Sequence, residues 1–238
     1  MNNKDDTKHI KIPPWEKPLF LSLMTFIGGY MNAYTYITRD KILANMHTAN
    51  MSKLGIKLAL GQWKNALSFF IPIVACILGA AFSQWVKYRV EKNKYKGDWR
   101  KIALILESVA LFGVGLIPTS VFDLIVTNIV SFLMGYQLCL FKKCFDIPYS
   151  TTICTGNIRN IGELSYFAVS EKSRYSIKKV LILTLLTFSF AGGAIPGTLI
   201  SLAISIKAVW VCSFILLSLV IWMNIYELNN SQHRKDKQ

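Results

Sequence analysis

The sequence predicts an all-α integral membrane protein with six transmembrane helices, two re-entrant or broken half-helices and an inverted repeat of three plus three spans. Three observations carry this prediction. First, hydrophobic residues make up 53% of the 238 residues, charged residues only 17%, and the mean hydropathy is +0.37, whereas soluble domains carry about 25% charged residues. Second, six long apolar runs lie along the chain. Third, two related polar motifs recur in its two halves.

The apolar runs approach or exceed the roughly 20 residues that cross a bilayer as a helix. Five contain no charged residue, and the third is short and carries Glu107. The fifth contains Gly192, Gly193, Pro196 and Gly197, which predict a break or hinge because proline removes a backbone donor and glycine tolerates unusual dihedrals. The runs are Leu19–Ile37, Ala66–Val86, Ile102–Ile117, Leu124–Phe141, Val180–Ile206 and Ala208–Tyr226.

The basic residues predict the orientation in the cell (plasma) membrane. The net charge is +14, and six spans with a cytoplasmic N-terminus put 21 of the 27 Lys and Arg residues inside. Both termini are therefore predicted to be cytoplasmic, although the outer segment 38–65 is also basic. Because the basic residues avoid the apolar runs, we expect the lipid bilayer as partner and no nucleic acid. The expected division is a tail 1–18, repeats 19–122 and 123–228, and a tail 229–238.

Two less apolar stretches, Ile42–Leu60 and Tyr149–Val169, are predicted to be half-helices that enter and leave the membrane on one side. If both crossed, the strongly basic segment 87–101 would lie outside, against the positive-inside rule. Irregular backbone at membrane depth is tolerated where protein buries it or where it lines a water-filled cavity.

The two stretches share a motif, which has Thr, a small residue and Asn, with a basic residue soon after. Each follows a span that contains a Gly-Tyr pair. Because each half holds three full spans, the second half must enter the membrane from the opposite side, as in the inverted repeats of many transporters. The half-helices would approach from opposite faces, and their motifs could meet near the middle. The motif residues are Thr48, Asn50 and Lys53 in the first half and Thr155, Gly156, Asn157 and Arg159 in the second.

These residues resemble the YoaK-like family of uncharacterised bacterial multi-pass membrane proteins, over about residues 18–228. The chain departs from the family at Asn32, usually Asp, and at Ala49, usually Gly. The resemblance implies the six-span architecture but no activity. It rests on segments 28–34, 44–50, 54–55, 135–138 and 151–157.

The motif residues have two readings. Thr and Asn are favoured N-caps, so capping of the half-helices explains their types. As a substrate site, two facing helix N-termini would hold an anion or the acceptor groups of a polar solute, with Lys53, Arg159 and Asn32 beside them. Arg159 and Glu163, four residues apart, are expected to pair along the helix.

Glu107 is the one acid inside a predicted full span. Intramembrane carboxylates are costly and often functional, so proton coupling is one reading. Its position near the inner end of the span slightly favours the other, in which it reaches the interface or pairs with a cytoplasmic Lys. The glycines at 28–29, 79, 113, 115 and 192–193 are read as close helix contacts.

The functional prediction is a transporter or channel for a small polar solute, such as an anion or a weak acid, with a pathway near the two motifs. The alternatives are a non-transporting scaffold or accessory protein and, less favoured, an intramembrane enzyme. We expect no enzyme activity, because no phosphate loop, nucleophile elbow or paired carboxylates occur. No metal site or cofactor is indicated, and a homo-oligomer is compatible with a small bundle.

Overall fold

The computed structural model describes residues 12–39, 41–94, 97–119, 123–144 and 147–235, and most of these residues are helical. The predicted all-α class is therefore confirmed. The α-helices are α1 (Pro18–Thr38), α2 (His47–Ala59), α3 (Trp63–Lys92), α4 (Trp99–Val114), α5 (Asp123–Leu138), α6 (Thr155–Ser170), α7 (Arg174–Ile204) and α8 (Trp210–Lys235). Two 3-10 helices, η1 (Pro14–Glu16) and η2 (Ser205–Val209), and a short antiparallel pair, β1 (Lys143–Cys144) and β2 (Ile147–Pro148), complete the fold.

Each predicted apolar run coincides with most of one helix, and α2 and α6 occupy the two less apolar stretches. Local signals account for several helix starts. Pro18 opens α1, where its missing N–H costs nothing. The Asp98 side chain accepts from the Arg100 amide at 2.8 Å at the start of α4, and Ser173 caps α7. α8 continues to Lys235, beyond the expected end of the second repeat at residue 228.

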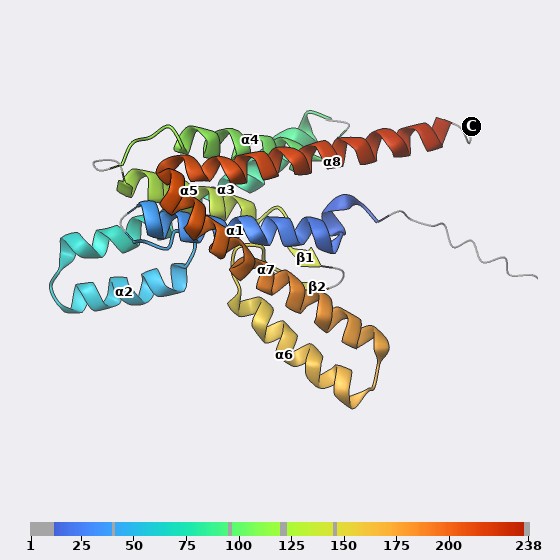
Figure 1. The fold of residues 1–238 in the computed structure, drawn as a ribbon, viewed down its shortest axis with the longest axis horizontal. Coiled ribbons are helices and arrows are strands. Elements are labelled where there is room, and N and C mark those ends of the chain that lie inside the picture. The colour runs from blue at the N-terminus through green and yellow to red at the C-terminus, as the bar shows by residue number, and fades with distance from the viewer. Residues whose placement is uncertain (1–11, 40, 95–96, 120–122, 145–146, 236–238) are drawn as a thin grey trace, which may run out of the picture.

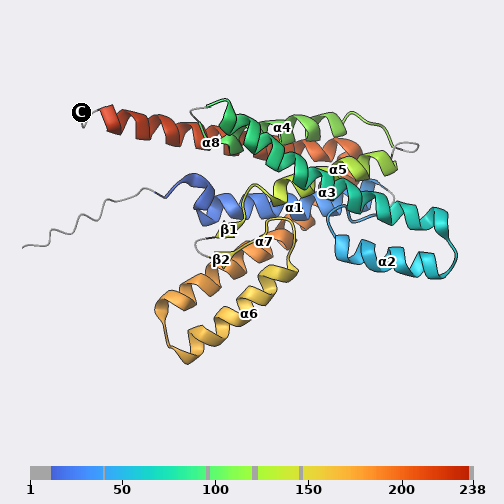
Figure 2. The same ribbon diagram turned by 180° about the vertical axis from the view of Figure 1, so that it is seen from behind.

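The helices pack in pairs that join the two halves of the chain. α1 packs along α7, α5 along α3 and α4 along α8, while α2 folds back on α3 and α6 folds back on α7. Figures 1 and 2 show α4 and α8 side by side along one side of the molecule, with α2 and α6 at the opposite side. The core is therefore built mainly from contacts between residues far apart in the sequence.

Glycines bring α1 and α7 into backbone contact. A Cβ built on Gly29 would lie 1.8 Å from the carbonyl oxygen of Phe190, and one on Gly193 would lie 2.0 Å from that of Phe26. Both distances are far shorter than any real contact, so only glycine fits at these two positions. Small residues have this role in helix pairs of membrane proteins.

The same arrangement occurs between α3 and α5. A Cβ on Gly135 would lie 2.2 Å from the carbonyl oxygen of Cys76, and one on Gly79 would lie 1.9 Å from that of Phe132. The close helix contact predicted for Gly79 is thus confirmed. Gly135 makes a second close contact, which was not predicted.

The break predicted in the fifth run is wrong, because α7 is one helix from Arg174 to Ile204 with Pro196 inside it. Tertiary packing accounts for the difference. A Cβ on Gly197 would lie 2.9 Å from the carbonyl oxygen of Tyr30, so Gly193 and Gly197 serve contact with α1. Gly192 faces open space, with nothing within 4 Å of a built Cβ, so the close contact predicted for it is also wrong.

Two helical stretches, Trp63–Lys92 and Arg174–Asn229, are long and apolar enough to cross a membrane by length and composition. The second covers α7, η2 and most of α8, and α5 is a shorter apolar helix. Large apolar side chains lie on their outer surfaces, with Phe188 68% exposed and Leu181 65% exposed. Such surfaces are typical of helices that face lipid.

Candidate functional site

The two motifs take the same arrangement at the starts of α2 and α6. In each, the threonine is exposed, at Thr48 and Thr155, while the asparagine two residues later is buried. Asn50 is 2% exposed and Asn157 is 1% exposed. The matching pattern means that each helix begins with one polar side chain directed outward and one directed into the protein.

The capping role expected for the motif residues is wrong. Met46 and Cys154 are the N-cap residues of α2 and α6, and neither makes a side-chain cap. Asn157 instead holds the preceding loop, because it accepts from the Ser150 amide at 3.0 Å and donates to the Ser150 and Ile153 carbonyls at 2.7 and 3.2 Å. A buried loop backbone needs such partners. The Asn50 side-chain nitrogen is buried without a hydrogen-bond partner among the described residues.

The loop before α2 is held by α1 and α5. The Asn45 side chain donates to the Gly28 carbonyl at 3.0 Å, and the Ser131 hydroxyl donates to the Ala44 carbonyl at 2.7 Å. Asn32, a predicted site residue, is 5% exposed, and its side-chain oxygen accepts weakly from the Asn45 amide at 3.5 Å. Asn45 therefore belongs to this site, although sequence reasoning named it only within the family motif.

The basic residues of the motifs lie on the outer surface. Lys53 is exposed and lies 5.5 Å from the centre of the Phe69 ring. Arg159 is 74% exposed and pairs with Glu163 at 3.3 Å, which confirms the predicted pair. Gly156 is exposed, with nothing within 4 Å of a built Cβ. Neither cation therefore faces its buried asparagine directly.

The starts of α2 and α6 lie toward the middle of the molecule, and the two helices run from there to opposite ends (Figure 1). α2 packs against α3 and α6 against α7, rather than against one another. Each motif therefore opens a helix that packs on the next helix of its own half, and the two helices run in opposite directions along the molecule.

Glu107 is fully buried in α4, at 0% exposure, and neither carboxyl oxygen has a hydrogen-bond partner among the described residues. The prediction that Glu107 reaches the membrane interface or pairs with a cytoplasmic Lys is therefore wrong. The neighbouring cation, Lys101, pairs with Glu227 at 2.6 Å and donates to Asn224 at 3.1 Å. An ionised carboxylate without a partner away from water is very costly.

A reciprocal hydrogen-bond pair next to Glu107 joins α4 to α8. Ser108 donates to the Ser213 carbonyl at 2.9 Å, and Ser213 donates to the Ser108 carbonyl at 2.8 Å. Glu107 and Cys212 directly precede these serines, so they occupy equivalent places on the two helices. The Tyr136 hydroxyl, on α5, is buried without a hydrogen-bond partner among the described residues.

Comparison with known families decides the relationship. A family model described as protein of unknown function (DUF1275) matches residues 20–222. The chain belongs to the DUF1275 family. This confirms the resemblance to uncharacterised YoaK-like proteins that the motifs indicated. No curated protein and no solved structure matches the chain.

The region matched by the DUF1275 model also contains a buried ion pair that sequence reasoning missed. Arg39, at 0% exposure, pairs with Asp123 at 2.7 Å. Its guanidinium also donates to the carbonyls of Ile117 and Pro118 at 2.7 and 3.0 Å. A signal was present, because Arg39 follows one apolar run and Asp123 precedes another on the same predicted side.

The thiols of this DUF1275 protein are all free. Burial raises the pKa of Cys144, in the connection between α5 and α6, to about 11, so this thiol is protonated at neutral pH and a poor nucleophile. Among the described residues, no group of three or more His, Cys, Asp or Glu side chains is arranged to hold a metal ion.

Proposed function

We propose that this protein is a multi-pass membrane transporter or channel for a small polar solute of the anion or weak-acid class. Its spans are α1, α3, α4, α5, α7 and α8, with both termini in the cytoplasm. The pathway passes the starts of α2 and α6. The observation that carries this proposal is that both helices begin toward the middle of the molecule beside a buried asparagine and run to opposite ends. Helix N-termini attract acceptor groups and anions.

Membrane insertion is supported by the apolar surface of the long helices. Soluble proteins rarely expose contiguous apolar patches beyond a few hundred Å². Here large apolar side chains recur along the outer face of α7, from Leu181 through Phe188 and Ile195 to Leu202, all above 60% exposure. Lipid is the solvent in which such a surface is stable.

An inverted repeat is supported by the pairing of equivalent helices. In this assignment α1, α3 and α4 correspond to α5, α7 and α8. Exchanging the halves converts the α1–α7 pair into the α5–α3 pair, and both are joined by two glycine-to-carbonyl contacts. The α4–α8 pair is converted into itself, and its two serine-to-carbonyl bonds are reciprocal in keeping with this exchange. Transporters with such repeats bind solute near the repeat interface.

Proton coupling through Glu107 is the mechanistic part of the proposal. A neutral, buried carboxylic acid releases its proton only when water reaches it, so opening of the repeat interface would link proton release to solute movement. The equivalent place in the second half holds Cys212. Glu107 therefore carries the coupled proton without a counterpart in the second half.

Cysteine labelling tests the pathway. In protein lacking native cysteines, Thr48→Cys and Thr155→Cys should each react with a small membrane-impermeant thiol reagent, the first from the outside and the second from the inside of sealed vesicles. We expect this result because both threonines are exposed at helix starts of opposite direction.

Phe188→Cys is the matched control for this labelling. Phe188 is 68% exposed in the protein but faces lipid under the proposal, so its cysteine should react slowly with the aqueous reagent. Protection of both motif cysteines would contradict the pathway, and rapid labelling at position 188 would contradict the membrane assignment.

Solute flux in proteoliposomes tests the coupling role. A panel of anions, weak acids and neutral solutes is measured with and without a proton gradient, and Glu107→Gln is expected to make the two rates equal. Cys212→Ser, at the equivalent place, should keep the gradient dependence. Gradient-dependent flux that survives in Glu107→Gln would contradict the role of Glu107, and no flux across the panel would count against transport.

A further inference from the structure

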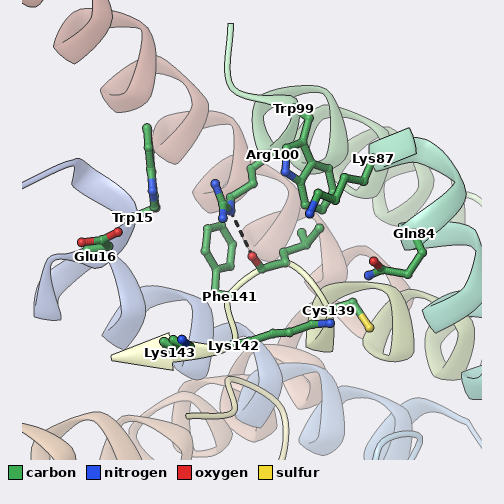
Figure 3. Close-up of a pocket in the computed structure, with 11 residues that line it drawn as sticks. Trp15, Glu16, Gln84, Lys87, Trp99, Arg100, Cys139, Phe141, Lys142 and Lys143 are labelled. Carbon is green, nitrogen blue, oxygen red and sulfur yellow. Dashed lines mark hydrogen bonds between the residues drawn. The ribbon is translucent and has the colours of Figure 1, made fainter. Parts of the chain in front are cut away.

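A cavity of about 430 Å³ opens between η1, the end of α3, the start of α4 and the segment after α5 (Figure 3). It lies apart from the two motifs, and its lining is strongly basic. Lys87, Arg100, Lys142 and Lys143 contribute four cations, and Glu16 is the one acid among its lining residues. A concave site with this charge attracts anions.

The cations differ in how far they are already neutralised. Lys142 and Lys143 are exposed and make no ion pair among the described residues. Lys87 has a long contact with Glu91, at 3.9 Å, on an exposed surface. In Figure 3 the Lys87 side chain comes from α3 and the Lys142 side chain from the segment after α5, and their amino groups lie apart. Lys142 and Lys143 are therefore the lining cations without an ion pair in the part of the chain that the structure describes.

Arg100 is fixed in place at the side of this cavity. Its guanidinium donates to the Leu140 carbonyl at 3.1 Å and to Asp98 at 2.8 Å, and it lies 5.7 Å from the ring centres of both Trp15 and Trp99. A cation held between two aromatic rings loses little freedom when it binds a ligand. Its second terminal nitrogen makes no hydrogen bond among the described residues.

We propose that this cavity binds a phosphate group. Several N–H donors around one cavity, on fixed and flexible cations, suit a tetrahedral oxyanion. The volume exceeds that of one phosphate and admits the group attached to it. Basic pockets beside transmembrane helices bind anionic lipid headgroups. Tryptophan, present here as Trp15 and Trp99, is enriched at the membrane–water interface. An anionic phospholipid and a soluble phosphate ester share this chemistry.

Binding to purified full-length protein tests the proposal without any transport measurement, so its failure is separate from failure of the transporter proposal. The probes are short-chain phosphatidylglycerol, short-chain phosphatidylcholine and inorganic phosphate, measured by native mass spectrometry and titration calorimetry in neutral detergent. The double variant Lys142→Gln/Lys143→Gln should bind phosphatidylglycerol about tenfold more weakly, since charge-assisted hydrogen bonds are lost. Lys172→Gln/Lys178→Gln removes the same charge from exposed sites elsewhere and should change binding less than about twofold.

The outcomes separate the sources of the phosphate. Phosphatidylglycerol binding that phosphate cannot displace supports a lipid headgroup, and displacement by phosphate supports a soluble ligand. Equal weakening in both double variants would overturn the site, because the effect would then be one of net charge. Equal binding of phosphatidylcholine and phosphatidylglycerol, or no binding of any probe, would overturn it as well.

Discussion

Gly29→Ala is expected to destabilise the protein by about 3 kcal/mol or more, at or above the upper end of the cost of overpacking. The added Cβ would lie 1.8 Å from the Phe190 carbonyl oxygen. That atom belongs to the backbone of α7, which cannot rotate away as a side chain can. The helices must therefore separate along their length, and the contact of Gly193 on Phe26 is lost with them.

Gly192→Ala is the matched control, because a Cβ there meets nothing within 4 Å. Alanine is favoured over glycine in a helix by about 1 kcal/mol, so this variant should be as stable as the parent or slightly more so. Thermal unfolding in detergent, followed by loss of the monodisperse species, measures both. Equal stability of the two variants would show that the close approach of α1 and α7 is wrong.

Arg39→Gln is expected to cost about 3–5 kcal/mol, since it breaks a largely buried ion pair by removing one of its two charges. Arg39 is 0% exposed, and it also satisfies the carbonyls of Ile117 and Pro118 at the turn between α4 and α5. The substitution should therefore loosen the end of α1 and the α4–α5 connection together.

Arg159→Gln supplies the control on an exposed pair. Arg159 and Glu163 are 74% and 60% exposed, and such pairs contribute about 0.5 kcal/mol or less. The loss of unfolding free energy in the double variant Arg39→Gln/Asp123→Asn should be smaller than the sum of the losses in its single variants, because both charges of the pair are removed together. Additive single effects, or similar costs at positions 39 and 159, would argue against a buried ion pair.

Prediction from the sequence was strongest for the helices and weaker for what their polar residues do. Long apolar runs place the helices because the backbone must satisfy its own hydrogen bonds where water is absent. The roles of Asn157 and Glu107 depend on their surroundings in the fold, which no local sequence pattern predicts. Asn157 holds a loop seven residues earlier, and Glu107 has no hydrogen-bond partner among the residues that the structure describes.

The amino-acid sequence by itself determined the all-α class, the helix positions, the duplicated motifs and the family. Tertiary structure decided which helices pair, why α7 stays continuous through Pro196, and which charged groups are buried together. The physical reason is the difference in sequence separation over which the two kinds of interaction act. Apolar periodicity and helix signals act within a few residues, whereas the Gly29–Phe190 contact and the Arg39–Asp123 pair arise only when distant segments pack.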